Sequence, residues 1–189
     1  MSYYIPGYDV SMIETHPFGS FVPQQARYLI LGSFTTKEAY NGQQEKYVWF
    51  YSNGGRNNFW PILEAVYGVE LKTRKQMEEL LTALEIVLAD IIYQCERTKS
   101  SNLDVNLTNI VYAIDDVTRI LTTNPIKKIF FTSRFVEGRF RRVFKTLINE
   151  HPEIELITLP SPSPRYVLMT KEQKIKCYKD AMPKLLRRL

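Results

Sequence analysis

Four short runs of nearly continuous apolar residues constrain the fold of this chain most strongly. They lie at residues 28–31, 86–92, 126–132 and 154–159. A strand that is apolar at almost every position is typical of a parallel sheet, because helices cover both faces of such a sheet. The four runs therefore predict an α/β fold with a parallel sheet that is buried on both sides.

Helical patterns between and after these runs support the same fold. Two of them begin with a capping-box pattern, Thr73 with Gln76 and Thr170 with Gln173. Gly68 marks the end of the first helix, and Pro183 is expected to kink or break the last one. The expected helices cover residues 58–67, 73–84, 115–121, 134–149 and 170–188.

Length and composition exclude several classes of protein. A chain of 189 residues is read as one domain, residues 1–189, and 44% apolar residues exclude global disorder. No apolar run approaches the roughly 20 residues of a membrane helix, and the first ten residues do not resemble a signal peptide. We therefore expect a cytoplasmic protein without a membrane span, acting as a monomer. Two cysteines and two histidines exclude Cys/His zinc sites and four-cysteine clusters, so we expect no metal and no cofactor.

The positive charge is concentrated in the second part of the chain. Residues 125–189 contain 8 Lys and 7 Arg against 5 Glu and 1 Asp, a net charge of +9, whereas residues 1–124 carry −4. Lys and Arg supply most of the non-specific affinity for nucleic acid through phosphate contacts, so a polyanionic partner fits this half. Solvated helix faces would account for the same charges equally well.

The loops that follow the strands are the expected place for chemistry, because ligands of parallel sheets gather at the carboxyl ends of the strands. Gly32 allows close approach of a ligand to the backbone, and Phe34 could stack on a flat ring. No GxGxxG, GxxxxGK[ST] or GxSxG motif is present, which argues against dinucleotides, nucleoside triphosphates and a serine hydrolase elbow.

The entry to the first helix has an unusual composition. Gly54-Gly55 precedes Arg56 and Asn57, so a cation and an amide stand together just before the helix. An amide can orient water or read a base edge, although it is no strong general base. Asn58 could serve simply as a helix cap, and Phe59 and Trp60 are expected to be core residues.

The segment after the last strand is a rigid Ser-Pro loop. Its prolines restrict the backbone, while Ser161 and Ser163 offer hydroxyl groups that could contact a phosphate backbone. Arg165 could bind phosphate, and Tyr166 could wedge into a base stack. An ordinary turn leaving a strand remains the alternative interpretation.

Taken together, these segments resemble the uracil-DNA glycosylase superfamily, most closely its hypoxanthine-DNA (deoxyinosine) glycosylase branch. The first motif of that branch, Gly-Ser-Phe-Pro-Gly, is similar to Gly32-Ser33-Phe34-Thr35-Thr36, and its Leu-Pro-Ser-Thr-Ser-Pro motif is similar to residues 159–164. Residues 51–60 resemble its Tyr-Gly-His-Pro-Arg-Asn-x-Phe-Trp segment, and residues 88–104 resemble its Leu-Trp-Asp, Cys-x-Arg and Ser-Leu-Asp elements. The four motifs occur in the same order.

The resemblance implies a three-layer α/β/α sandwich with a four-stranded parallel sheet. It also implies a monofunctional DNA glycosylase that flips a deaminated base, hypoxanthine or else uracil or xanthine, out of DNA and hydrolyses its N-glycosidic bond. By this resemblance Asn57 is the catalytic residue, and DNA is the partner. The base pocket would comprise Gly32, Ser33, Phe34, Tyr51 and Arg56, and the DNA-binding loop Ser161, Ser163, Arg165 and Tyr166.

Two other functions fit the same residues. One is a glycosylase-like module that binds DNA without cutting it, which would show lesion binding but no abasic product. The other is a small-molecule enzyme that acts on free nucleosides or nucleotides and lacks salt-dependent affinity for DNA.

Overall fold

The computed structural model describes residues 13–35, 49–51, 57–97 and 104–186, and the predicted parallel sheet is present among them. Its strands are β2 (Tyr28–Gly32), β3 (Ile86–Asp90), β6 (Lys128–Phe131) and β7 (Glu155–Thr158). They lie side by side in the order β3-β2-β6-β7, and each neighbouring pair is parallel. All four carboxyl ends therefore meet at one edge of the sheet.

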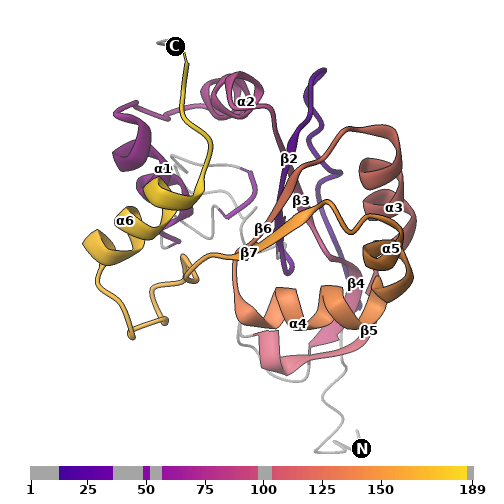
Figure 1. Ribbon diagram of the computed structural model, residues 1–189. Helices are drawn as coiled ribbons and strands as arrows, with labels where there is room; N and C mark the ends of the chain where they lie inside the picture. Colours follow the sequence, from indigo (N-terminus) through magenta and orange to yellow (C-terminus); the bar gives the residue numbers. More distant parts are fainter. Residues whose placement is uncertain (1–12, 36–48, 52–56, 98–103, 187–189) are drawn as a thin grey trace, which may run out of the picture.

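Helices cover both faces of this sheet, which gives the three-layer α/β/α fold (Figure 1). On one side lie α1 (Phe59–Tyr67), α2 (Arg74–Ala83) and α6 (Lys171–Ala181), and on the other lie α3 (Ile114–Thr123), α4 (Arg134–Val143) and α5 (Lys145–Glu150). Both predicted capping boxes are confirmed at α2 and α6. The last helix ends at Ala181, just before Pro183, as the proline predicts.

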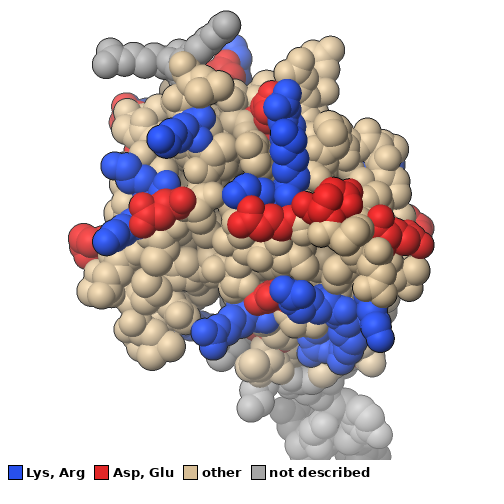
Figure 2. Space-filling view, in the orientation of Figure 1, with Lys and Arg blue, Asp and Glu red and all other residues tan. Residues whose placement is uncertain are grey.

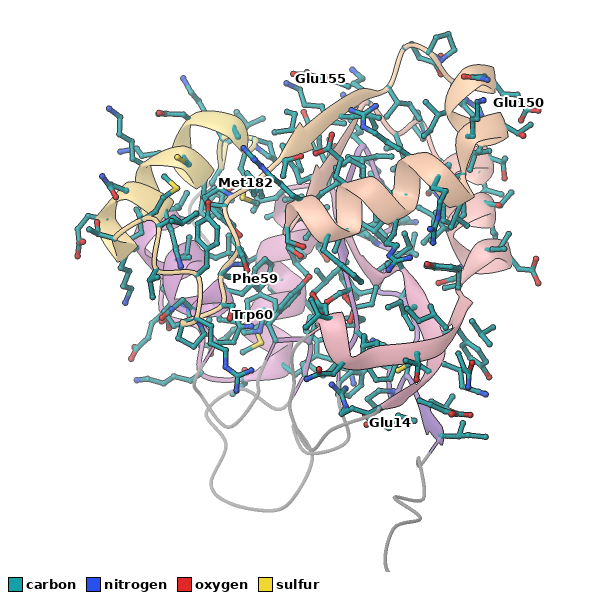
Figure 3. The ribbon with its side chains drawn as sticks, turned by 90° about the horizontal axis from the view of Figure 1, so that it is seen from below. Glu14, Phe59, Trp60, Glu150, Glu155 and Met182 are labelled. Atoms are coloured by element: carbon teal, nitrogen blue, oxygen red, sulfur yellow. The ribbon has the colours of Figure 1, made fainter. Side chains whose placement is uncertain are left out.

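The apolar runs are continuous because successive residues of one strand enter two different cores. In β2, Leu29 and Leu31 pack with α3 and α4, while Ile30 packs with α1 and α2. In β6, Phe130 is fully buried on the side of α1. Burial of one such side chain stabilises the fold by roughly 1.5–3 kcal/mol. Figure 3 shows Phe59 and Trp60 in the interior, on the same side of the molecule as Met182, whereas Glu150 and Glu155 lie at the periphery.

A second, antiparallel sheet departs from the predicted secondary structure. It contains β1 (Ile13–Thr15), β4 (Ile92–Arg97) and β5 (Leu107–Tyr112) in the order β1-β4-β5, and a short 3₁₀ helix, Asp104–Asn106, precedes β5. The prediction of one strand over residues 86–92 was therefore wrong. The parallel strand ends at Asp90, and Ile92 already pairs with Tyr112. Both halves of the run are buried, so the apolar pattern alone does not reveal the change of sheet.

The helix expected at residues 134–149 is also two helices. Phe144 lies between α4 and α5 with φ −106° and ψ 27°, outside the helical region. Its ring is buried and stacks on Phe140 at a centroid distance of 5.0 Å, so packing at the core stabilises the break. None of the described helices is both long enough and apolar enough to cross a membrane.

Candidate active site

A cavity of about 370 Å³ opens at the carboxyl edge of the parallel sheet. Its walls come from the loop after β2, the end of β3, the turn into α4, the entry to α1 and the loop after β7. It therefore occupies the position at which ligands of parallel sheets bind. The lining residues include Ser33, Phe34, Thr35, Tyr51, Asn57, Asp90, Arg97, Asp104, Thr132, Ser133, Phe135, Ser161, Ser163, Arg165 and Tyr166.

Most of the site residues predicted from the sequence meet in this cavity. Ser33, Phe34, Tyr51 and Asn57 line it together with the four predicted residues of the Ser-Pro loop, although more than 100 residues separate these two groups in the chain. Gly32 is not among the lining residues but lies behind them. Arg56 lies outside the described residues.

Asn57 combines a place in the cavity with a structural bond to α1. Its Oδ1 accepts a hydrogen bond of 2.9 Å from the backbone N–H of Phe59, which otherwise lacks an intrahelical partner. The neighbouring Asn58, considered above as the simple cap, makes no side-chain cap bond. Since the carbonyl oxygen of Asn57 is engaged by the helix, its Nδ2 group is the part of the amide that can donate to a ligand.

The entry to α1 is tied directly to the Ser-Pro loop. The backbone N–H of Asn58 donates to the carbonyl oxygen of Pro162 at 3.1 Å. Inside the loop, Ser161 Oγ accepts from the N–H of Ser163, and Ser163 Oγ accepts from the N–H of Arg165. The hydroxyl oxygens are thus held by the backbone, while each hydroxyl proton can still be donated to an acceptor such as a phosphate oxygen.

Behind the cavity, Gly32 provides space for two buried oxygen atoms. A Cβ atom at position 32 would stand 2.1 Å from Tyr51 OH and 2.1 Å from Asp90 Oδ1. Both oxygens are buried and lack a hydrogen bond of regular geometry among the described residues. The backbone of Tyr51 has a φ of 59°, which costs a non-glycine residue of order 1–3 kcal/mol. A strained residue beside a buried carboxylate oxygen that lacks a regular hydrogen bond is typical of a functional site.

The other carboxylate oxygen of Asp90 anchors two further segments. His16 Nε2 donates to Asp90 Oδ2 at 2.9 Å, and Thr35 Oγ1 donates to the same oxygen at 2.9 Å. The second ring nitrogen, Nδ1, lies 2.5 Å from the carbonyl oxygen of Phe18 and also 3.2 Å from the backbone N–H of Phe18, so it faces both an acceptor and a donor. Burial lowers the pKa of His16, but the bond and charge of Asp90, together with the Phe18 carbonyl and the charge of Asp116, outweigh it, so the pKa is raised. The segment around His16 matches no motif, so the sequence alone does not indicate a role for this residue.

The His16–Asp90 pair predicts a pH-dependent contribution to stability. Because the pKa of His16 is higher in the folded state, this contribution is fully present below the unfolded-state pKa of about 6.5 and is lost as pH rises through the folded-state value. We expect His16→Gln to destabilise the protein more at pH 5.5 than at pH 8.5, as measured by urea unfolding. His151→Gln is the control, because the side chain of His151 bonds to the exposed Glu153 rather than to a buried carboxylate. An equal loss at both pH values would contradict a charged pair.

A second carboxyl group, that of Asp104, also lines the cavity. Burial, with a smaller contribution from the charge of Asp90, raises its pKa, while a hydrogen bond to Ser33 and the nearby Arg97 lower it in part. Arg97 itself donates to Glu14 at 2.7 Å. The cavity therefore offers carboxyl and hydroxyl acceptors beside the amide donor of Asn57, which suits a small polar ring with both donors and acceptors.

Two apolar residues after the Ser-Pro loop are more exposed than Tyr166, which the sequence suggested as a wedge into the base stack. Tyr166 is half-buried, whereas Val167 and Leu168 are 82% and 80% exposed. Two fully accessible apolar side chains beside the mouth of a polar cavity are suited to insertion between stacked bases. The only signal for them in the sequence was their position after Arg165-Tyr166.

Basic residues gather beside the same mouth. Figure 2 shows Lys and Arg side chains concentrated over α4. This helix begins directly after Ser133 and contributes Phe135 to the cavity wall. It bears Arg134, Arg139, Arg141 and Arg142, of which Arg141 pairs with Glu137. Part of the net positive charge of residues 125–189 thus borders the cavity.

Comparison with known structures identifies the fold. The chain is similar to a candidate uracil DNA glycosylase from Methanosarcina acetivorans, solved by NMR in solution, with a TM-score of 0.60 and 21% sequence identity. The similarity covers 89% of this chain and 98% of the other. No protein-family model matches the sequence, and no curated protein is similar to it. The chain thus has the α/β/α fold of that protein.

Proposed function

We propose that this protein is a DNA glycosylase that removes a deaminated base, hypoxanthine or else uracil or xanthine. The observation that carries this proposal is the convergence of Asn57, Phe34 and the Ser-Pro loop on one cavity at the carboxyl edge of the sheet. Its volume lies within the range of about 300–1,000 Å³ that is common for small-ligand sites. A basic helix at the mouth fits a nucleic-acid substrate rather than a free nucleoside.

The proposed reaction begins with extrusion of the damaged nucleotide, because a base inside a duplex cannot reach the cavity. The bond between C1′ of the sugar and the nitrogen of the base then breaks, leaving an oxocarbenium-like sugar and an anionic base. Water adds its oxygen to C1′ and keeps one proton there as the new hydroxyl group, while its other proton neutralises the departing base. Donors aimed at the base stabilise this transition state more than the ground state.

Each described residue has a proposed part in this reaction. Asn57 donates through Nδ2 to the departing base, since its Oδ1 is bonded to the start of α1. Phe34 stacks on the base, and Ser33 and Tyr51 shape the pocket around it. Asp90 acts as a positioning residue, because it ties the segments of His16 and Thr35 to the pocket. Arg56 keeps its predicted place in the pocket as a proposal.

The direct test uses short duplexes that contain one hypoxanthine, uracil or xanthine. After incubation and alkali treatment, we expect strand breaks at one or more of the three modified bases, and the duplex that is cut fastest identifies the preferred base. If all three duplexes bind but remain intact, the protein is a DNA-binding module instead. Turnover of free deoxyinosine without affinity for DNA would indicate a small-molecule enzyme.

The exposed pair Val167 and Leu168 predicts a difference between duplex and single-stranded substrates. If these side chains fill the space that the flipped base leaves, Val167→Ser with Leu168→Ser should slow excision from a duplex by about 10-fold, because part of the few kcal/mol that unstacking costs is then no longer offset. Excision from single strands should change little. Leu186→Ser serves as the control, because Leu186 is 91% exposed and does not line the cavity. Equal losses on both substrates would exclude a wedge.

A further inference from the structure

Lys174 is a buried lysine directly beneath the Ser-Pro loop. It lies on α6 and is only 3% exposed, whereas Lys171, Lys176 and Lys179 of the same helix are exposed. Its Nζ donates to the carbonyl oxygen of Ser163 at 3.1 Å and lies 5.1 Å from the ring centroid of Tyr166. Lys174 thus contacts two residues of the loop that lines the cavity.

Among the described residues, Lys174 forms no ion pair with a carboxylate. Burial lowers the pKa of its ammonium group, and none of the described acidic side chains opposes this shift. A buried charge without a counter-ion is unfavourable, because the carbonyl oxygen and the aromatic ring replace only part of its hydration. The protein therefore retains a cation here whose partner is not provided by its own described acidic side chains.

The surroundings of Lys174 define the chemistry of that partner. Residues 161–166 contain two hydroxyl groups whose oxygens accept from backbone N–H groups, so their protons are left to donate outward. Arg165 is exposed next to them, and no acidic residue occurs in this segment. Hydroxyl donors over one buried and one exposed cation match a singly charged phosphodiester.

The loop is also held firmly enough to transmit such a contact. Tyr178, one turn after Lys174 on α6, donates to the carbonyl oxygen of Pro160 at 3.1 Å. Pro162 accepts from the N–H of Asn58 at the entry to α1. A phosphate seated on this loop would therefore act on the segment that bears Asn57.

We propose that a backbone phosphate of the bound DNA is the counter-ion of Lys174, which positions Ser163 and Tyr166 for that phosphate. Lys174 is then a positioning residue of the DNA site, and this inference rests on the proposed function. The ammonium group must be protonated to act in this way. Affinity for DNA should consequently fall as pH rises through its lowered pKa.

The salt dependence of DNA binding tests this proposal without any chemical step. Binding to a duplex with a tetrahydrofuran abasic analogue is measured by fluorescence anisotropy between about 50 and 300 mM NaCl. Each neutralised phosphate contributes roughly 0.9 to the slope of log Kd against log salt. Lys174→Met should lower the slope by about that amount and weaken binding at least 5-fold near 100 mM salt. Lys176→Met, exposed on the same helix, should change neither.

The pH profile separates a charge role from a merely structural one. Lys174→Met should remove the alkaline loss of affinity that the parent shows. Among the described titratable side chains, Tyr166 lies against Lys174. Burial raises the pKa of Tyr178, four residues further along the same helix, far out of this range. The proposal would be overturned if Lys174→Met kept both the parent's slope of log Kd against log salt and its loss of DNA affinity at alkaline pH.

A second measurement uses the unaltered protein, in case Lys174→Met does not fold. Single methylphosphonate linkages are placed one at a time around the abasic analogue. At one position, the neutral linkage should weaken binding at least 5-fold and also abolish the loss of DNA affinity at alkaline pH. If this loss of affinity survives with the linkage at every position, the proposal is refuted. Base excision is assayed separately, so a protein that binds in this way but releases no base disproves the proposed enzyme and leaves Lys174 assigned.

Discussion

Asn57→Asp should abolish most of the base excision while leaving the fold intact. The aspartate keeps an oxygen that accepts from the Phe59 N–H, and its charge is favourable at a helix start. It lacks the Nδ2 donor, and its negative charge opposes the developing charge on the departing base. We expect a loss of about 100-fold or more in the single-turnover rate, the effect of removing one donor to a developing anion. The rate is measured with excess enzyme on a hypoxanthine duplex.

Two controls separate the two roles of this side chain. Asn57→Ala removes both the cap and the donor, so it should lose the same activity and about 1 kcal/mol of stability. Asn58→Ala should affect neither property strongly, because Asn58 makes no side-chain cap bond. Parent-like excision by Asn57→Asp would show that the amide group is not the catalytic donor.

Gly32→Ala should distort the site from behind. The new methyl group would stand 2.1 Å from both Tyr51 OH and Asp90 Oδ1, far inside contact distance. Because Asp90 is bonded to His16 and Thr35, its displacement would disturb the whole pocket. We expect a loss of about 1–3 kcal/mol in the free energy of unfolding, the usual range for overpacking. Excision should fall together with stability.

The double variant Gly32→Ala with Tyr51→Phe identifies the cause. Deletion of the buried hydroxyl removes one of the two clashing oxygens, and it should be tolerated by itself because that hydroxyl has no regular hydrogen bond among the described residues. Part of the free energy of unfolding that Gly32→Ala loses should therefore return in the double variant. Gly138→Ala is the matched control, since its Cβ would meet no atom within 4 Å and lies in a helix, where alanine is favoured. If Gly32→Ala were as stable as Gly138→Ala, the close packing around Gly32 would be wrong.

The parallel sheet could be predicted from the sequence because its signal is local. Each of its strands is a short apolar run, and the faces of Leu29 and Ile30 follow from the alternation of side chains along a strand. The capping boxes at Thr73 and Thr170 are equally local, since each bond joins residues three apart. These features require no knowledge of distant contacts.

The second sheet and the His16–Asp90 pair could not be predicted in the same way. Ile13–Thr15 pairs with residues some 80 positions away, and three residues carry too little pattern to indicate a strand. His16 and Asp90 are 74 positions apart, and only the fold brings them within 2.9 Å. For Asn57 the sequence indicated the right segment, but which of two adjacent asparagines caps the helix depends on the geometry of the turn.

Release of a free base from DNA in ¹⁸O-labelled water tests the central claim most directly. The parent protein is incubated with a duplex that contains one hypoxanthine, and the products are identified by mass spectrometry. Our account predicts free hypoxanthine without label and an abasic site that carries one ¹⁸O at C1′, with the DNA strand unbroken. Intact hypoxanthine-, uracil- and xanthine-containing duplexes, or an abasic site without the label, would contradict it.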